Sequence, residues 1–148
     1  LRLHVATSHL PVKDIVETRV LLESWAASRA SPESPALAEA ARLLEQMDTC
    51  AETETFLALD VRFHLALADA AGNAVVSAMM GSLREAIQDY AGRLTGNLPD
   101  WDATAARLRT EHRGIQAAIT THDGGRAAQL VADHIEGYYA EAGVGSGA

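Results

Sequence analysis

The sequence predicts an all-α protein, on three observations. Alanine is abundant, and aromatic residues make up only 5% of the chain. Valine and isoleucine recur in patterns with a period near 3.6 residues, which is the period of an amphipathic helix. No segment shows the strict alternation of apolar and polar residues that a half-buried strand requires. We therefore expect helices throughout.

Length and charge limit the classes of protein to consider. A chain of 148 residues suits one domain with a substantial core. Its 12 basic and 20 acidic residues give a formal charge of −8, which would repel a phosphate backbone. The single cysteine, Cys50, excludes an internal disulfide, and no apolar run approaches the roughly 20 residues of a membrane span. The chain starts at Leu1 without a signal-like segment, so we expect a cytoplasmic piece of a longer protein with no membrane partner.

Turn-forming residues divide the chain into its expected elements. Residues 1–10 have no steady period and are expected to be a linker or the end of an upstream segment, with His4 and His9 in solvent. A helical domain over 11–142 and a flexible, glycine-rich tail over 143–148 should follow. Two prolines in 31–35 and the pair Gly72-Asn73 mark turns. The six expected helices cover about 11–28, 36–49, 53–71, 74–94, 102–121 and 126–142.

The first helix can begin at Pro11, because proline is well tolerated at the first helical position. Its apolar stripe comprises Val12, Ile15, Val16, Leu22 and Ala26. Arg19 lies at the centre of this stripe, with Glu23 one turn further on. Two interpretations stay open: a buried ion pair within the helix, or an arginine that points into a pocket.

The second helix is interpreted as scaffold. The second carries Leu37, Ala40, Leu44 and Met47 on one face. The fourth has an inward face of Val76, Met79, Met80, Leu83, Ile87 and Tyr90, with Arg84 along its edge. Asn73 precedes this helix and can cap it.

The third helix carries two metal-capable side chains on its apolar stripe. This stripe comprises Phe56, Leu57, Phe63, Leu67 and Ala71. Asp60 and His64 fall in its middle and, four residues apart, face the same side one turn from each other. They could bind one ion in the core, or His64 could be a hydrogen-bonded core residue that Asp60 orients.

Two further helices also place a histidine on the buried stripe. The fifth has His112 among Ala105, Leu108, Ile115 and Ile119. The last has His134 among Ala127, Leu130, Val131, Gly137 and Tyr138. Three buried imidazoles and Asp60 would make a crowded polar core unless something bound there. This donor set suits zinc, nickel, manganese or iron better than calcium or magnesium.

The order and spacing of these residues also resemble a known family. The matching positions are Arg19 and Glu23 with Ala26 and Ala27, Asp60 with Phe63 and His64, Ala70 with Gly72 and Asn73, Leu83 with Arg84, Glu111 and His112 with Ile115, Ala118 and Ile119, and Asp123 with Ala127 and His134. Together they resemble the ligand-binding FCD domain of the FadR branch of GntR-type bacterial transcription regulators. The resemblance covers almost the whole chain.

The resemblance implies an antiparallel bundle of six to seven helices around a metal site. By position, the metal ligands would be Asp60, His64, His112 and His134, with zinc the favoured ion and a small carboxylate as effector in an adjacent cavity. The family also implies a homodimer. Its winged helix-turn-helix, which contacts operator DNA, is not in this chain, so operator DNA would be bound only through that domain.

The sequence thus predicts a metal-dependent effector-binding and dimerisation domain of a transcription regulator, and not an enzyme. Arg19 is the expected second anchor of the carboxylate, with Asn73 and Arg84 as further effector contacts. Apolar residues that lie outside these stripes, such as Leu21, Trp25 and Leu65, are candidates for subunit contacts.

The alternative is a metal-dependent hydrolase that uses the same Asp and three His. It would need a general base beside the metal. Glu111 lies about 100° around its helix from His112, and Glu23 is the only glutamate near the centre of a core stripe.

Overall fold

The structure, a computed structural model, describes residues 10–144 of the chain. The all-α prediction is confirmed, because this part of the chain contains six α-helices and a short 3-10 turn, with no strand. The elements are α1 (Val12–Arg29), α2 (Pro35–Asp48), α3 (Thr53–Asp69), α4 (Ala74–Leu94), η2 (Thr95–Asn97), α5 (Trp101–Thr120) and α6 (Gly124–Glu141). Helix boundaries lie within about two residues of those expected, as is usual for helix ends.

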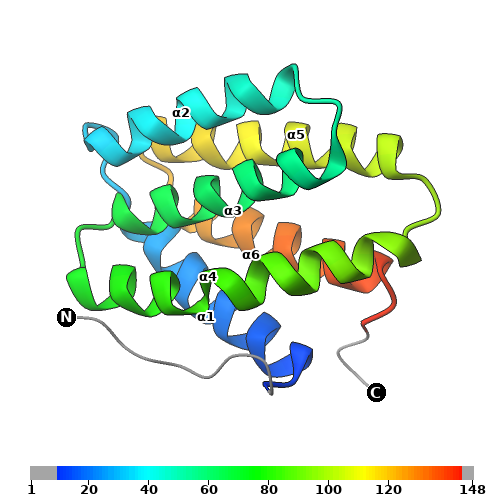
Figure 1. Ribbon diagram of the computed structural model, residues 1–148. Helices are drawn as coiled ribbons and strands as arrows, with labels where there is room; N and C mark the ends of the chain where they lie inside the picture. The colour runs from blue at the N-terminus through cyan, green and yellow to red at the C-terminus, as the bar shows by residue number, and fades with distance from the viewer. Residues whose placement is uncertain (1–9, 145–148) are drawn as a thin grey trace.

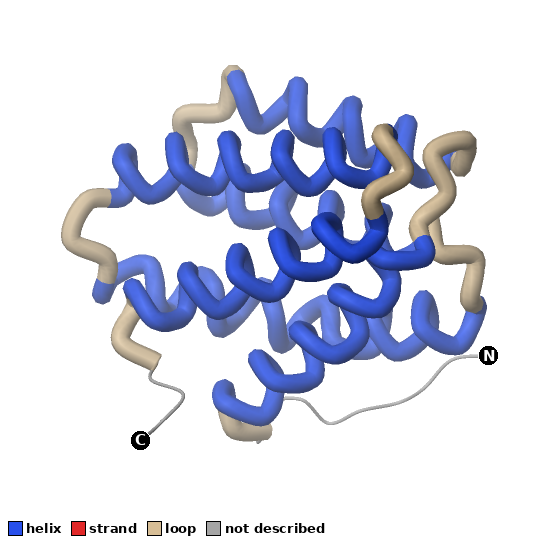
Figure 2. Tube along the Cα trace, turned by 180° about the vertical axis from the view of Figure 1, so that it is seen from behind, coloured by secondary structure: helices blue, strands red, loops and turns tan. Residues whose placement is uncertain are grey.

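The helices form a bundle in which α3 and α6 occupy central positions (Figure 1). Helix α3 packs between α2 and α4, while α6 packs between α1 and α5. Helix α1 also contacts α3 and α4, and so connects the two sets. Seen from behind, the loops lie at the ends of the bundle (Figure 2). This arrangement turns one face of α3, α5 and α6 toward a shared interior.

The apolar core has two parts that meet at α3. The larger is built mainly from α2, α3, α5 and α6, and includes Phe56, whose ring contacts Trp101 edge-on at a centroid distance of 5.4 Å. The smaller joins α1, α3 and α4 around Val61 and Met80. Helix α3 is buried on several sides, and its polar residues in the interior need partners from the protein or from a ligand.

Several helix starts are fixed by side-chain caps. The Oδ1 atom of Asn73 accepts hydrogen bonds from the backbone nitrogens of Val75 and Val76 at 3.0 and 3.1 Å, so the predicted cap of α4 is confirmed. Ser34 and Asp100 cap α2 and α5 in the same way. Each cap satisfies backbone donors that would otherwise lack a partner.

The inward face predicted for the last helix was wrong at Gly137, which is exposed. Because α6 packs against both α1 and α5, its buried arc is wide and is centred away from Gly137. Tyr139, which the sequence analysis did not select, is buried in this arc instead.

Some predictions concern the ends of the chain. Those for the solvated His4 and His9, for most of the linker and for most of the tail fall outside the described residues.

None of the helices within residues 10–144 is long and apolar enough to cross a membrane.

The start of α6 depends on a residue without a side chain. A Cβ added at Gly124 would lie 2.5 Å from the backbone oxygen of Ser28, at the end of α1. Gly124→Ala should therefore lower the free energy of unfolding by about 1–3 kcal/mol, the usual cost of overpacking. Urea denaturation followed by circular dichroism measures this change.

The matched control is Gly125→Ala, where an added Cβ would meet no atom within 4 Å. It should leave stability unchanged or raise it slightly, because alanine favours helix more than glycine does. Equal losses in the two variants would contradict the close approach of α6 to α1.

Candidate metal centre

Four side chains from three helices converge in the interior. Asp60 and His64 come from α3, His112 from α5 and His134 from α6, and one ligand atom of each lies within 4.8 Å of those of the other three. The three imidazoles are buried, and the Asp60 side chain is 13% exposed. The structure therefore brings together all four residues that the sequence predicted as metal ligands, and their role as ligands stays a prediction.

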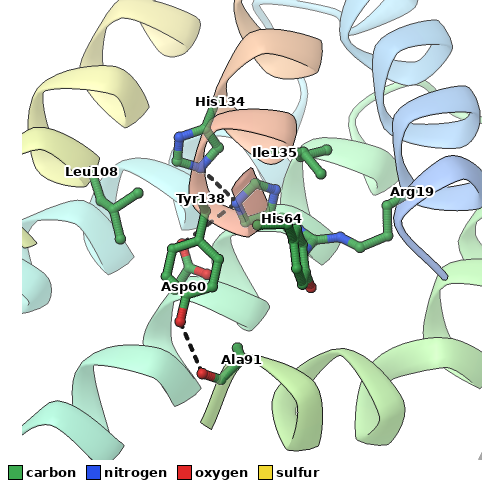
Figure 3. A pocket seen from close by; sticks show the side chains of 9 residues that line it. Arg19, Asp60, His64, Ala91, Leu108, His134, Ile135 and Tyr138 are labelled. Carbon is green, nitrogen blue, oxygen red and sulfur yellow. Dashed lines mark hydrogen bonds and ion pairs between the residues drawn. The ribbon is translucent and has the colours of Figure 1, made fainter. Parts of the chain in front are cut away.

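Two of the histidines are oriented by carboxylates. His64 Nδ1 donates to Glu23 Oε1, and His134 Nδ1 donates to Glu111 Oε1 at 2.7 Å. In a neutral imidazole whose Nδ1 carries the proton, Nε2 presents a lone pair. The Nε2 atoms of His64 and His134 lie only 3.2 Å apart (Figure 3). Two lone pairs at this distance repel each other unless a proton or a metal cation lies between them.

The other two members of the cluster have buried polar atoms without hydrogen bonds. The buried atoms without a hydrogen-bond partner are Asp60 Oδ1 and both ring nitrogens of His112. His112 Nε2 and Asp60 Oδ1 contact each other at 2.7 Å, whereas His112 Nδ1 has no partner among the described residues. Each unsatisfied buried polar atom costs about 1–3 kcal/mol. A cation bound by Asp60 Oδ1 and one ring nitrogen of His112 would remove that cost for these two atoms, so the residues fit a metal with nitrogen and oxygen ligands.

The charges in the centre favour one added cation. Burial lowers the pKa of His134 to about 4 and also lowers that of His112, which keeps both rings neutral. Burial acts against the charged form of His64 too, but the carboxylates of Glu23 and Asp60 outweigh it and raise the pKa to about 9. Burial disfavours the Asp60 carboxylate, yet His64 and His112 hold its pKa well below its usual value. Without a metal, protonated His64 supplies the positive charge between Asp60 and His134.

A small cavity of about 20 Å³, roughly the room for one water molecule, adjoins the centre (Figure 3). Asp60, His64 and His134 form its side toward the candidate metal centre, and Arg19 approaches it from α1. The rest of its wall is largely apolar or aromatic, and consists of Ala91, Leu108, Ile135, Tyr138 and Tyr139. The lining therefore offers charged groups beside an apolar wall, and a ligand larger than a water molecule would have to widen the cavity.

Arg19 both forms an ion pair and lines the cavity, so the two interpretations of this residue are compatible. Its Nε donates to Glu23 Oε2 at 2.7 Å, and its Nη1 donates to the Tyr139 hydroxyl at 3.1 Å. Burial would lower the pKa of Arg19, but Glu23 raises it above its ordinary value. These bonds use two of the five guanidinium N–H groups. Among the described residues, Nη2 has no hydrogen-bond partner.

The structure does not bring Asn73 or Arg84 to the cavity. The Asn73 side chain is engaged in capping α4, and Arg84 is exposed on the outside of the same helix. Neither residue lines the cavity wall. Their contact with an effector stays a prediction, and this geometry does not support it.

Sequence reasoning missed some of the residues around the centre. It noted the position of Glu111 beside His112 but not its hydrogen bond to His134, which depends on how α6 packs against α5. It placed Tyr138 on the inward face without assigning it to a cavity. Its hydroxyl donates to the backbone oxygen of Ala91 at 2.8 Å, which places the ring in the cavity wall.

Comparison with known proteins agrees with this geometry. Residues 14–137 match the family model of the FCD domain, the C-terminal domain of GntR-family regulators such as FadR. The chain belongs to the FCD family. No curated protein matches the sequence. The matched segment of this FCD domain contains the four clustered residues and Arg19.

The geometry predicts that zinc stabilises the folded domain and that His112→Asn removes this effect. A ligand that binds only the native state stabilises it by about 2.7 kcal/mol at a hundredfold excess over its dissociation constant. Thermal unfolding of metal-free protein with and without zinc measures the difference. The effect should weaken in acid, because imidazole ligands must be deprotonated to bind a metal.

His122→Asn is the matched control. His122 is exposed and has a φ of 61°, a conformation that asparagine tolerates. This variant should keep the stabilisation by zinc. Equal stabilisation of the His112→Asn variant would exclude His112 from the metal centre.

Proposed function

We propose that this FCD domain is a metal-dependent sensor of a small carboxylate in a cytoplasmic transcription regulator. The observation that carries the proposal is the pair of opposed Nε2 atoms of His64 and His134, with the unsatisfied Asp60 and His112 beside them. The membership of this chain in the FCD family supports its role in a transcription regulator.

The four side chains would hold one divalent transition metal. Three imidazole nitrogens and one carboxylate oxygen favour zinc, with nickel, manganese and iron as alternatives. Such a metal, when bound, offers coordination positions that a carboxylate oxygen can occupy. Glu23 and Glu111 keep the Nδ1 protons of His64 and His134 in place, so that both Nε2 atoms stay available to it.

The cavity wall would provide the remaining contacts to the effector. Arg19 presents unused N–H donors from a buried position, and a planar guanidinium is well suited to an acidic group. Leu108 and Ile135 provide an apolar wall for the body of the ligand. We therefore propose a small carboxylate effector held between the metal and Arg19.

The hydrolase alternative lacks a free general base. Glu23 is bound by His64 and Arg19, while Glu111 is bound by His134. Neither carboxylate lines the cavity. This arrangement supports sensing over hydrolysis, since a general base must reach a water or substrate proton.

The output of the sensor would be a change in dimer geometry. Effector binding would shift the population between two arrangements of the subunits, and thereby the spacing of DNA-binding domains attached to them. Operator DNA would be bound only through such a winged helix-turn-helix domain. The acidic chain described here carries a formal charge of −8 and is not the proposed DNA contact.

Replacement of Arg19 should weaken effector binding without a loss of the metal. We expect Arg19→Ala to reduce carboxylate affinity by about 1.5–3 kcal/mol, the usual contribution of a charged hydrogen bond. A thermal-shift screen of formate, acetate, propionate and lactate selects the acid, and calorimetry on zinc-loaded protein measures its affinity. Elemental analysis should still find one zinc per chain.

Arg84→Ala is the matched control, because Arg84 is exposed and away from the cavity. It should bind the acid as the unmodified protein does. Normal binding by the Arg19→Ala variant would show that Arg19 serves only to pair with Glu23.

An exposed apolar face on α1 supports a homodimer. Leu21 is 70% exposed and Trp25 is 37% exposed, whereas Leu65 is half-buried against the smaller core and is a weaker candidate for a subunit contact.

Leu21→Asp should lower the mass measured by light scattering toward that of a monomer, because it places a charge in an apolar interface. Ala38→Asp, at an exposed position on α2, should leave the mass unchanged. A monomer mass for the unmodified domain at all concentrations would contradict the dimer.

A further inference from the structure

A single carboxylate contacts both the candidate metal centre and the candidate effector anchor. The Glu23 side chain is 3% exposed and lies between α1 and α3. Its Oε1 accepts the Nδ1 proton of His64, and its Oε2 accepts the Nε proton of Arg19 at 2.7 Å. Each oxygen therefore fixes a different functional side chain.

We propose that Glu23 is a positioning residue that mechanically connects the metal ligand His64 to the effector anchor Arg19. This inference rests on the proposed function. A rotation or shift of the Glu23 carboxylate must move both hydrogen bonds, because both oxygens belong to one rigid planar group. Metal bound to His64 and an acid bound to Arg19 then act on each other through Glu23, in addition to any direct contact between them.

Glu111 provides a comparison within the same centre. It accepts the Nδ1 proton of His134, as Glu23 accepts that of His64. Its second oxygen, however, faces Arg107 at 3.4 Å near the surface, and its side chain is 32% exposed. Glu111 should thus orient a metal ligand without any connection to Arg19.

The chemistry of an amide separates these two roles. Glutamine has the shape of glutamate but only one acceptor oxygen. In Glu23→Gln, that oxygen can serve either His64 or Arg19, and the amide nitrogen is a donor that faces the other donor. If Arg19 is also replaced by methionine, the single oxygen can return to His64. The effect of Glu23→Gln on the metal should therefore depend on Arg19.

The experiment measures zinc affinity by competition with a chromophoric chelator. We expect Glu23→Gln and Glu111→Gln each to weaken zinc binding by about 10–100-fold, which is typical for residues that orient metal ligands. In the Arg19→Met background, the loss caused by Glu23→Gln should become much smaller. The loss caused by Glu111→Gln should be the same in both backgrounds, because independent sites act additively.

Glu17→Gln controls for the change in charge on α1, since Glu17 is exposed on the same helix. It should leave zinc affinity unchanged. Circular dichroism of each metal-free variant establishes that it is folded. If Glu23→Gln fails to fold, Glu23→Asp replaces it, because its carboxylate keeps the charge but is too short to reach both partners. Glu23→Asp should then weaken zinc binding by at least about tenfold.

Three outcomes are decisive. Unchanged zinc affinity in Glu23→Gln or in its Glu23→Asp replacement would overturn the positioning role. An equal loss from Glu23→Gln in both backgrounds would overturn the connection to Arg19. Failure of the unmodified protein to bind zinc, or any of nickel, manganese and iron, would instead overturn the proposed function itself.

Discussion

The Nε2 atoms of two imidazoles, His64 and His134, lie 3.2 Å apart in the core of this domain, and the surrounding structure holds them there. His64 and His134 cannot turn their Nε2 atoms away without losing the hydrogen bonds of their Nδ1 atoms to Glu23 and Glu111. Asp60 and His112 add further unsatisfied atoms at the same point. The arrangement is stable only with a positive charge in the middle, supplied by a proton on His64 or by a metal ion.

This constraint depends on how the helices pack around α3 and α6. Each of these helices packs between two neighbours, so that its polar residues in the interior meet side chains from other helices and not water. Helix α1 completes the arrangement, because it contacts both α3 and α6 and carries Arg19 and Glu23 on its buried face. The close approach of Gly124 to the end of α1 belongs to the same packing. The scaffold thus determines where the charged groups of the centre meet.

Most of the fold and the four clustered residues could be predicted from the sequence, because both depend on helical periodicity. Asp60, His64, His112 and His134 occupy the middle of apolar stripes, and such stripes must face one interior. Contacts between different helices could not be predicted in this way. The bond of Glu111 to His134 depends on the rotation of α5 relative to α6, and the positions of Asn73 and Arg84 outside the cavity depend on how α4 is placed. Gly137 was misplaced because the buried arc of α6, which faces both α1 and α5, is centred away from this residue.

The central claim is that the four side chains bind one metal ion, and X-ray absorption at the zinc K-edge tests it most directly. The account predicts a first shell of only nitrogen and oxygen near 2.0–2.2 Å, with the outer-shell scattering of about three imidazole rings. Loss of one of these rings in the His112→Asn variant would assign His112 to the shell. A spectrum with sulfur in the first shell, or one without imidazole scattering, would contradict the account.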